Sequence, residues 1–223
     1  GDIVVGNGTA SNNAVIGRIG FSTDSSNSRF IGMESFRGGD AANGDLRFHT
    51  FGGDSDSGER VRIHTNGVLS ASDGIALGVG TANTASNVLD DYEEGTFTPG
   101  LIDSADGLGA NLTTQVGQYT KVGNLVTFSL RINGDARTST GNQVFITNLP
   151  FTFSPTSTVN RIQFEVNGIN LGLDSNFFSL NGQLANTDTS LTILMQGTSL
   201  DNFRGHDLTP SYEIYVHGSY FTS

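Results

Sequence analysis

The stretch that most constrains the fold is Gln118–Ile132, where apolar and polar residues alternate without interruption after Gly123-Asn124. The apolar positions are Val126, Phe128, Leu130 and Ile132, and the polar positions between them are Thr127, Ser129 and Arg131. Successive side chains leave opposite faces of a strand, so this alternation is typical of a strand that is buried on one face. Because Gly123-Asn124 separates the strand from a shorter run at 119–122, the stretch predicts a β-hairpin.

The composition favours short strands joined by tight turns. The chain of 223 residues contains 30 glycines and 15 phenylalanines, 15% charged residues and a net charge of −11. An acidic surface argues against binding to nucleic acid or to an anionic membrane, because both need clustered Lys and Arg. No apolar run is long enough for a membrane-spanning helix. The absence of cysteine excludes a disulfide framework, a thiolate metal site and a cysteine nucleophile.

Residues 1–69 predict a series of short strands with few apolar side chains each. Turn-rich runs separate the segments that we expect to be strands: 3–5, 15–21, 30–34, 46–50, 60–64 and 68–69. Leu46 and Phe48 share one face, as do Val61 and Ile63. So small an apolar set would be marginally stable alone. We therefore expect an N-terminal intertwined trimeric β shaft or knob, in which several copies bury these residues together.

Residues 70–94 are expected to form a connector with a short helical turn at 86–92. From residue 95 onward the alternation strengthens, and the expected strands are 96–98, 116–121, 125–132, 143–147, 161–166, 177–181, 191–196 and 211–221. Large side chains occur on both faces of the last strand, which indicates burial on one face and a covered or oligomer-facing surface on the other. Eight antiparallel strands predict that residues 95–223 form a distal β-sandwich, jelly-roll-like, in an all-β protein.

Candidate binding residues lie in two loops of this distal domain. Asn202, Phe203, Arg204 and His206 precede the last strand, and Asp135 and Arg137 follow the central strand. Aromatic, amide, guanidinium and imidazole groups provide stacking and hydrogen-bonding partners for a sugar. The alternative for both segments is an ordinary surface turn.

The sequence contains no convincing catalytic or metal-binding constellation, and we predict that the protein is not an enzyme and has no cofactor. The carboxylates of Asp90, Asp91, Glu93 and Glu94 are adjacent in sequence and would diverge, whereas glycan hydrolysis needs a facing pair. His49 or His64 near a trimer axis would offer a three-nitrogen metal site, and 54–59 offers alternating oxygen ligands for calcium. The alternatives, solvated strand-end histidines and a polar turn, lead us to predict no metal.

Three segments of the chain together resemble bacteriophage tail fibres. Asp45–Thr50 followed by Glu59–Leu69 resembles the "ERVRI…GxV" segment of fibre shafts. Leu89–Pro99 resembles the linker that opens a distal fibre domain, and Gly117–Val126 resembles the start of that domain. The likeness extends over roughly residues 45–223. It departs from one class of fibres because no self-cleaving chaperone domain follows the shaft segment.

This resemblance implies a homotrimeric virion tail-fibre protein, of which the chain would be the distal fragment. Its distal β domain would attach the phage to the host cell through a surface glycan or an outer-membrane protein. No nucleic acid and no membrane insertion are expected, and the location would be the tail fibre of the extracellular particle. The alternatives are a structural fibre or capsid-decoration protein without a receptor role, and a polysaccharide-degrading tailspike.

Overall fold

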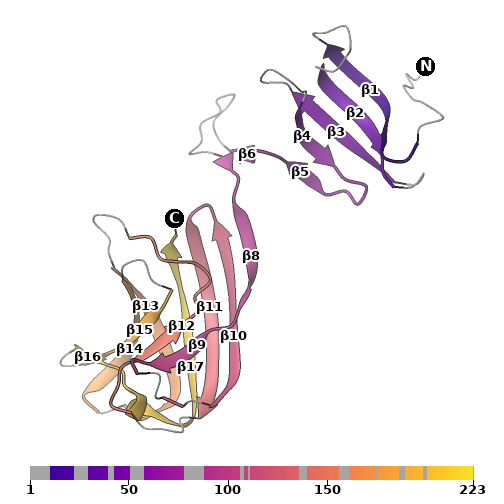
Figure 1. Cartoon of the computed structure of the whole chain (residues 1–223). Helices are drawn as coiled ribbons and strands as arrows, with labels where there is room; N and C mark the ends of the chain where they lie inside the picture. The colour runs from indigo at the N-terminus through magenta and orange to yellow at the C-terminus, as the bar shows by residue number, and fades with distance from the viewer. Residues whose placement is uncertain are drawn as a thin grey trace. The chain divides into compact units, whose positions relative to one another are not determined.

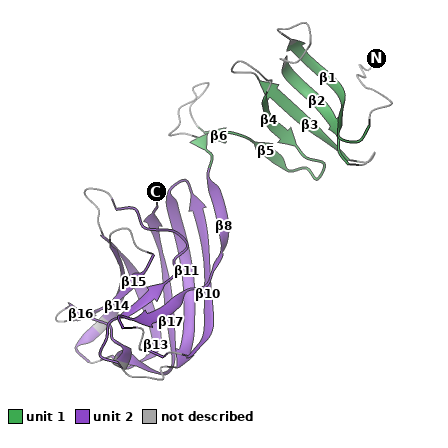
Figure 2. Ribbon diagram, in the orientation of Figure 1, with its two compact units in different colours: residues 1–90 green, residues 91–223 purple. Residues whose placement is uncertain are grey.

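The structure of the chain is a computed structural model that divides into two compact units, residues 1–90 and 91–223 (Figure 2). It describes residues 11–22, 30–39, 43–50, 58–77, 88–105, 108–109, 111–135, 140–155, 161–173, 175–185, 189–197 and 200–222. The division lies four residues before the expected start of the distal domain at residue 95. The reason is that strand β8 (Tyr92–Phe97) pairs with β10 (Asn111–Val122) of the second unit.

The prediction of an all-β protein is confirmed (Figure 1). Apart from one short 3-10 helix, η2 (Gly205–Asp207), all regular elements in the described ranges are strands, and none of their helices could cross a membrane. The helical turn expected at 86–92 is wrong for the described part of that segment. Val88 and Leu89 form β7 (Val88–Leu89), which pairs with β6 (Ile75–Ala76), and Tyr92 begins β8.

The first unit contains a five-stranded antiparallel sheet in which neighbouring strands follow chain order. Its strands are β1 (Ala14–Ser22), β2 (Phe30–Arg37), β3 (Gly44–Thr50), β4 (Gly58–Ile63) and β5 (Leu69–Ala71). Five of the six expected strands are therefore present with similar bounds, and the sixth, 3–5, lies outside the described residues. Each strand can pair with its predecessor because only short segments of sequence, rich in Gly, Ser, Asp and Asn, separate the strands.

One face of this sheet is apolar and exposed. Leu46 lies opposite Ile63 and Phe48 opposite Val61, so the expected shared faces are confirmed. The exposed fraction is 84% for Phe21 and 55% for Leu69. The other large apolar side chains that remain exposed on this face are Ile19, Ile31, Met33, Phe48 and Ile63. A sheet needs a second layer to bury such a face, and the exposed fractions show that the described residues of the first unit leave it uncovered.

The opposite face carries a network of ion pairs. At its centre the carboxylate of Glu34, only 5% exposed, lies 3.1 Å from Arg18 Nη2 and 3.2 Å from His49 Nε2. Next to it, Arg62 donates two hydrogen bonds to Glu59, of 2.6 and 2.7 Å, and Arg47 lies 3.4 Å from Asp45. The guanidinium of Arg47 also covers the ring of Phe36, 3.4 Å from its centroid.

The charges of this network are balanced, since three arginines face three carboxylates. The hydrogen bonds from Arg62 lower the pKa of Glu59 below its ordinary value, and Glu59 in turn raises the pKa of Arg62. Burial alone would raise the pKa of Asp45, but hydrogen bonding and the charges of Arg47 and Arg62 lower it. The lowered pKa values keep Asp45 and Glu59 ionised at neutral pH, and the arginines that pair with them belong to the same copy of the chain.

The second unit is built from one curled antiparallel sheet of ten strands, a half-barrel, rather than from the two separate sheets expected for a sandwich (Figure 1). The hydrogen-bonded order is β8-β10-β11-β17-β13-β14-β15-β12-β9, and β16 pairs with β15. The remaining strands are β9 (Gly100–Asp103), β11 (Leu125–Asp135), β12 (Val144–Thr147), β13 (Arg161–Leu171), β14 (Phe177–Ala185), β15 (Leu191–Gly197), β16 (Leu200–Asn202) and β17 (Leu208–Phe221). All eight expected strands occur, and β9 and β16 were missed.

The order of the strands explains why the sheet curls. β8 and β9 lie at opposite ends of the order, yet only Thr98-Pro99 separates them in sequence. Consecutive Cα atoms are about 3.8 Å apart, so the two ends of the sheet must approach each other at this corner. The sheet thereby wraps around its own inner face, which becomes the core.

The hairpin that constrained the fold is confirmed. Val122 pairs with Leu125, and Gly123, at the first turn position, has a φ of 57°. A positive φ at this position is what a type II′ turn requires, and glycine adopts it without steric cost. Val126, Phe128, Leu130 and Ile132 all point to the core and are at most 5% exposed.

Aromatic packing joins the central strands of the core. The ring of Phe128 contacts those of Phe164 and Tyr220 edge-on, at centroid distances of 5.3 and 5.8 Å. The hydroxyl of Tyr220 donates to the carbonyl of Phe151 and accepts from its N–H, which attaches the loop before β13 to the last strand. Burial raises the pKa of Tyr220 to about 12, so this phenol is neutral under physiological conditions.

Glycine makes room for a ring in this packing. A Cβ added at Gly218 of β17 would lie 2.1 Å from Cδ1 of Phe164, which fills the space above the glycine. The same device occurs at Gly182, where a Cβ would lie 2.4 Å from Cδ2 of Leu191. Both contacts are too close for any side chain to be accommodated without movement of the core.

We predict that Gly218→Val destabilises the second unit by about 1–3 kcal/mol, because the added atoms overlap the ring of Phe164 and overpack the core. Denaturant unfolding followed by tyrosine fluorescence measures the change. The matched control is Gly141→Ala, since no atom lies within 4 Å of a Cβ built at Gly141, and we expect a change below about 0.5 kcal/mol. Equal effects of the two substitutions would contradict the packing described here.

Candidate binding surfaces

The loop before the last strand, proposed from the sequence as a sugar contact, contains a residue of the core. Phe203 is 0% exposed, its N–H donates to the carbonyl of Ile193, and its carbonyl accepts from Val144 N. Its ring is therefore part of the hydrophobic core and is not available to stack on a ligand. The physical reason is that β16 ends by turning its chain inward, so an aromatic residue that looks like a loop residue fills the end of the half-barrel.

Asn202 and Arg204 lie beside Phe203 and point toward a neighbouring segment. Gln143 Nε2 donates to Asn202 Oδ1 at 2.8 Å, and Arg204 Nη1 donates to the carbonyl of Gly141 at 2.8 Å. Arg204 Nη2 also lies 3.7 Å from Asp201. Both side chains are partly exposed, but their hydrogen-bonding groups hold residues 141–143 in place. This arrangement supports the ordinary-turn alternative for their main role.

The structure describes the remaining candidates only in part. The side chain of His206 and the whole of Arg137 lie outside the described residues. Asp135 ends β11 and is partly exposed, and in the described ranges no hydrogen bond or ion pair joins it to Asn202 or Arg204. The two candidate loops are thus not shown to form one site, and their receptor role stays a prediction.

A buried carboxylate organises this end of the unit. Asp103 of β9 is 1% exposed and accepts hydrogen bonds from Thr140 Oγ1 at 2.7 Å, from Asn142 Nδ2 at 3.3 Å and from Ala105 N at 3.0 Å. A buried charge is tolerated only when hydrogen bonds replace its hydration. Asp103 therefore fixes residues 140–142, which in turn hold the side chain of Arg204.

We predict that Asp103→Ala lowers the free energy of unfolding by about 1–3 kcal/mol, because three donors lose their acceptor in a buried place. Thermal and denaturant unfolding of the full chain measure the effect. Asp201→Ala is the control, because Asp201 is exposed and its ion pair with Arg204 is long, so a change of about 0.5 kcal/mol or less is expected. If Asp103→Ala leaves the free energy of unfolding unchanged, this carboxylate does not hold the loop.

A second surface lies on the outer face of the sheet, which is the face opposite the core. Here β10, β11 and β17 are neighbours, and their side chains line up in cross-strand rows. One row consists of Thr120, Thr127 and Ser219, and the next of Gln118, Ser129 and His217. Small hydroxyl residues and amides occupy positions where large side chains would fill the surface, so the face is hollowed between the rows.

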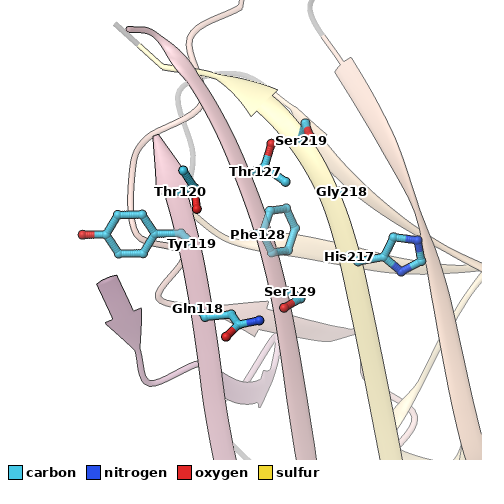
Figure 3. Close-up of a pocket in the computed structure, with 9 residues that line it drawn as sticks. All are labelled: Gln118, Tyr119, Thr120, Thr127, Phe128, Ser129, His217, Gly218 and Ser219. Atoms are coloured by element: carbon cyan, nitrogen blue, oxygen red, sulfur yellow. Dashed lines mark hydrogen bonds between the residues drawn. The ribbon is translucent and has the colours of Figure 1, made fainter. Parts of the chain in front are cut away.

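The first hollow has a volume of about 490 Å³ and lies between these two rows (Figure 3). Tyr119, Phe128 and Gly218 form the row between them, and Phe128 is 2% exposed because its ring points to the core. The floor of the hollow is thus the strand backbone, and its walls are polar side chains. Thr127 Oγ1 and Ser219 Oγ lie 2.9 Å apart and hydrogen-bond to each other.

A second hollow of about 410 Å³ adjoins the first, and Gln118 and Ser129 line both. Its far wall contains Val116, Arg131 and Tyr215. The carboxylate of Glu213 accepts hydrogen bonds from the hydroxyl of Tyr215 and from Arg131 Nη2, the latter at 3.2 Å. These bonds lower the pKa of Glu213, chiefly through Tyr215, and raise the pKa of the Tyr215 phenol.

Most polar side chains of the two rows have no partner within the described residues. In that part of the chain, no side-chain hydrogen bond or ion pair is made by Gln118, Thr120, Ser129 or His217. On the neighbouring wall, by contrast, Glu213 accepts hydrogen bonds from Arg131 and Tyr215. The outer face therefore combines a fixed wall with a set of donors and acceptors that remain available to a ligand. Chemically, the arrangement suits hydrogen bonding to a hydroxyl-rich molecule.

Sequence reasoning missed this surface as a candidate site. The alternation placed Thr127, Ser129 and Arg131 together on the polar side of one strand, which is correct. However, Gln118 and His217 join them only because β10 and β17 flank β11, and residues 129 and 217 are far apart in sequence. A run of uncharged polar residues at alternate positions in several strands was the available signal.

The acidic run at the start of the unit does not form a facing pair of free carboxylates. Asp91 pairs with the ammonium of Lys121, Glu93 accepts from the hydroxyl of Tyr119 at 2.5 Å, and Glu94 accepts from Tyr92 at 2.9 Å. Each carboxylate thus has a different partner on β8 or β10. Within the ranges described, no group of three His, Asp or Glu side chains is placed to hold a metal ion. Most of the run 54–59 lies outside those ranges.

Comparison of the chain with protein-family models, with curated proteins and with solved structures finds no match.

Proposed function

We propose that the chain is the distal part of a homotrimeric phage tail-fibre protein that attaches the virion to the host cell surface. The first unit assembles the copies, and the second presents the binding surface. The observation that carries the proposal is the contrast between the two units. The first leaves an apolar face uncovered, whereas the second encloses its own core and exposes a hollowed polar face. The resemblance of Glu59–Leu69 and Leu89–Pro99 to fibre segments gives this contrast its biological setting.

The apolar face of the first unit supports assembly with further copies of the same chain. It runs across all five strands, from Phe21 on β1 to Leu69 on β5. The charged face cannot replace it as the contact, because its arginines and carboxylates are already paired within one copy. Three such sheets packed around a common axis would bury their apolar faces against one another, as an intertwined trimeric shaft or knob does.

We predict that Phe48→Glu dissociates this assembly, because it places a charge in the middle of the apolar face, where Phe48 pairs with Met33 and Val61. Light scattering at micromolar concentration is expected to give three times the mass of one chain for the wild type and a lower mass for the variant. The control is Ser70→Glu, which adds the same charge on the opposite face beside Arg62. A monomeric wild type would refute the trimer.

Host attachment is tested with the fluorescently labelled full chain on a panel of bacterial strains. Saturable binding to some strains and none to others is the expected result, because a receptor-binding protein discriminates between surfaces. A properly assembled trimer that binds no strain would contradict attachment and favour a structural fibre or decoration protein, whose position on the particle electron microscopy would show. Release of reducing ends from host polysaccharide would instead identify a tailspike enzyme.

A further inference from the structure

We infer that the two adjoining hollows on the outer face of β10, β11 and β17 bind an uncharged glycan chain. This inference rests on the proposed attachment function and names the surface and the class of ligand that carry it. It moves the binding site from the loops, where the sequence placed it, to the face of the sheet. Its basis is the set of polar side chains around Gln118 and Ser129, which line both hollows.

The chemistry of the lining fits sugar hydroxyl groups. Each hydroxyl of a sugar both donates and accepts a hydrogen bond, and the side chains of Gln118, Ser129 and Thr120 also do both. These three and His217 make no side-chain hydrogen bond within the described parts of the chain. Binding a hydroxyl-rich ligand would therefore break no existing contact of these groups. An apolar ligand would leave them without partners, at a cost in free energy.

The shape of the surface fits a chain rather than a single compact molecule. The hollows of about 490 and 410 Å³ adjoin at Gln118 and Ser129 and form one trough that is open to solvent. From Thr120 to Val116 the trough follows five residues of β10, a length of about 13 Å at the usual rise of a strand. The backbone floor and the exposed side chain of Val116 offer flat surface to the faces of sugar rings.

Tyr215 supplies an aromatic wall that is held in place. Its hydroxyl binds Glu213, and the guanidinium of Arg131 lies 5.7 Å from the centroid of its ring. An aromatic side chain fixed before binding loses little conformational entropy when a ligand packs on it. The second hollow thus offers apolar contact to the C–H face of a sugar, while the first offers mainly hydrogen bonds.

The charges around the trough favour an uncharged ligand over an acidic one. Among the described residues no carboxylate lines either hollow, and the one arginine that does, Arg131, is paired with Glu213. An anionic polysaccharide would meet no free cation among the residues that line the hollows and would approach a chain of net charge −11. A neutral glycan meets neither obstacle.

The experiment uses the full chain and a panel of purified polysaccharides, with dextran, mannan and galactan as neutral probes and alginate and polysialic acid as anionic ones. Binding to at least one neutral polysaccharide is expected. Gln118→Trp, which fills the junction of the two hollows, is expected to weaken that binding by about tenfold or more. Gln163→Trp is the matched control, because Gln163 is an exposed glutamine of β13 that lines neither hollow, and its affinity should change less than about twofold.

A second variant, Gln118→Ala with His217→Ala, removes hydrogen-bonding groups without adding bulk, so a folding defect of the Trp variant does not leave the inference untested. Unchanged affinity in both variants, or binding to anionic probes only, would overturn it. A change in the mass of the assembly caused by Gln118→Trp would also overturn it, because the trough would then be an interface between copies.

The proposed attachment function can survive the failure of this inference. If the chain binds host cells but no longer binds them after protease treatment of the cells, the receptor is a protein and attachment stands without the glycan site. If no cell binds the wild type, attachment itself fails.

Discussion

Burial of the alternating apolar residues of β11 is the interaction on which the second unit depends. β11 lies between β10 and β17, and its side chains Val126, Phe128 and Ile132 are almost completely excluded from solvent. The curl of the sheet makes this burial possible, because strands at both ends of the order reach the same interior. The outer face of these strands is then free of any role in the core, and polar side chains can occupy it without loss of stability.

The first unit does not bury the apolar face of its sheet in the way that the second unit does. A sheet of five short strands is too small to curl around its own apolar face, so that face stays exposed while the opposite face is closed by ion pairs. Buried carboxylates such as Glu34 are acceptable there because Arg18 and His49 lie against them. The two units thus differ in how they treat their apolar faces, since the first leaves one exposed and the second encloses a core.

Much of the fold was predictable because the strands are regular. Period-two alternation located β11 with its inward face correct, and it also identified the shared faces of β3 and β4. It located β17 as well, but large side chains on both faces left its inward face open. Two strands were missed for local reasons: Gly100–Asp103 is short and follows Pro99, and Leu200–Asn202 has only one apolar residue. The prediction of a sandwich was wrong, because the number of strands alone does not say whether they belong to one sheet or to two.

The sequence by itself determined the class of fold, the position of the hairpin and the inward faces of its strongest strands, because these depend on local alternation and turn chemistry. Only the tertiary structure decided which strands are neighbours. That information makes Phe203 a core residue instead of a sugar contact, and it brings Gln118, Ser129 and His217 together on one surface. The reason is physical: the pairing of β11 with β17 joins residues that are 78 to 96 positions apart in sequence, and no local pattern records such a pairing.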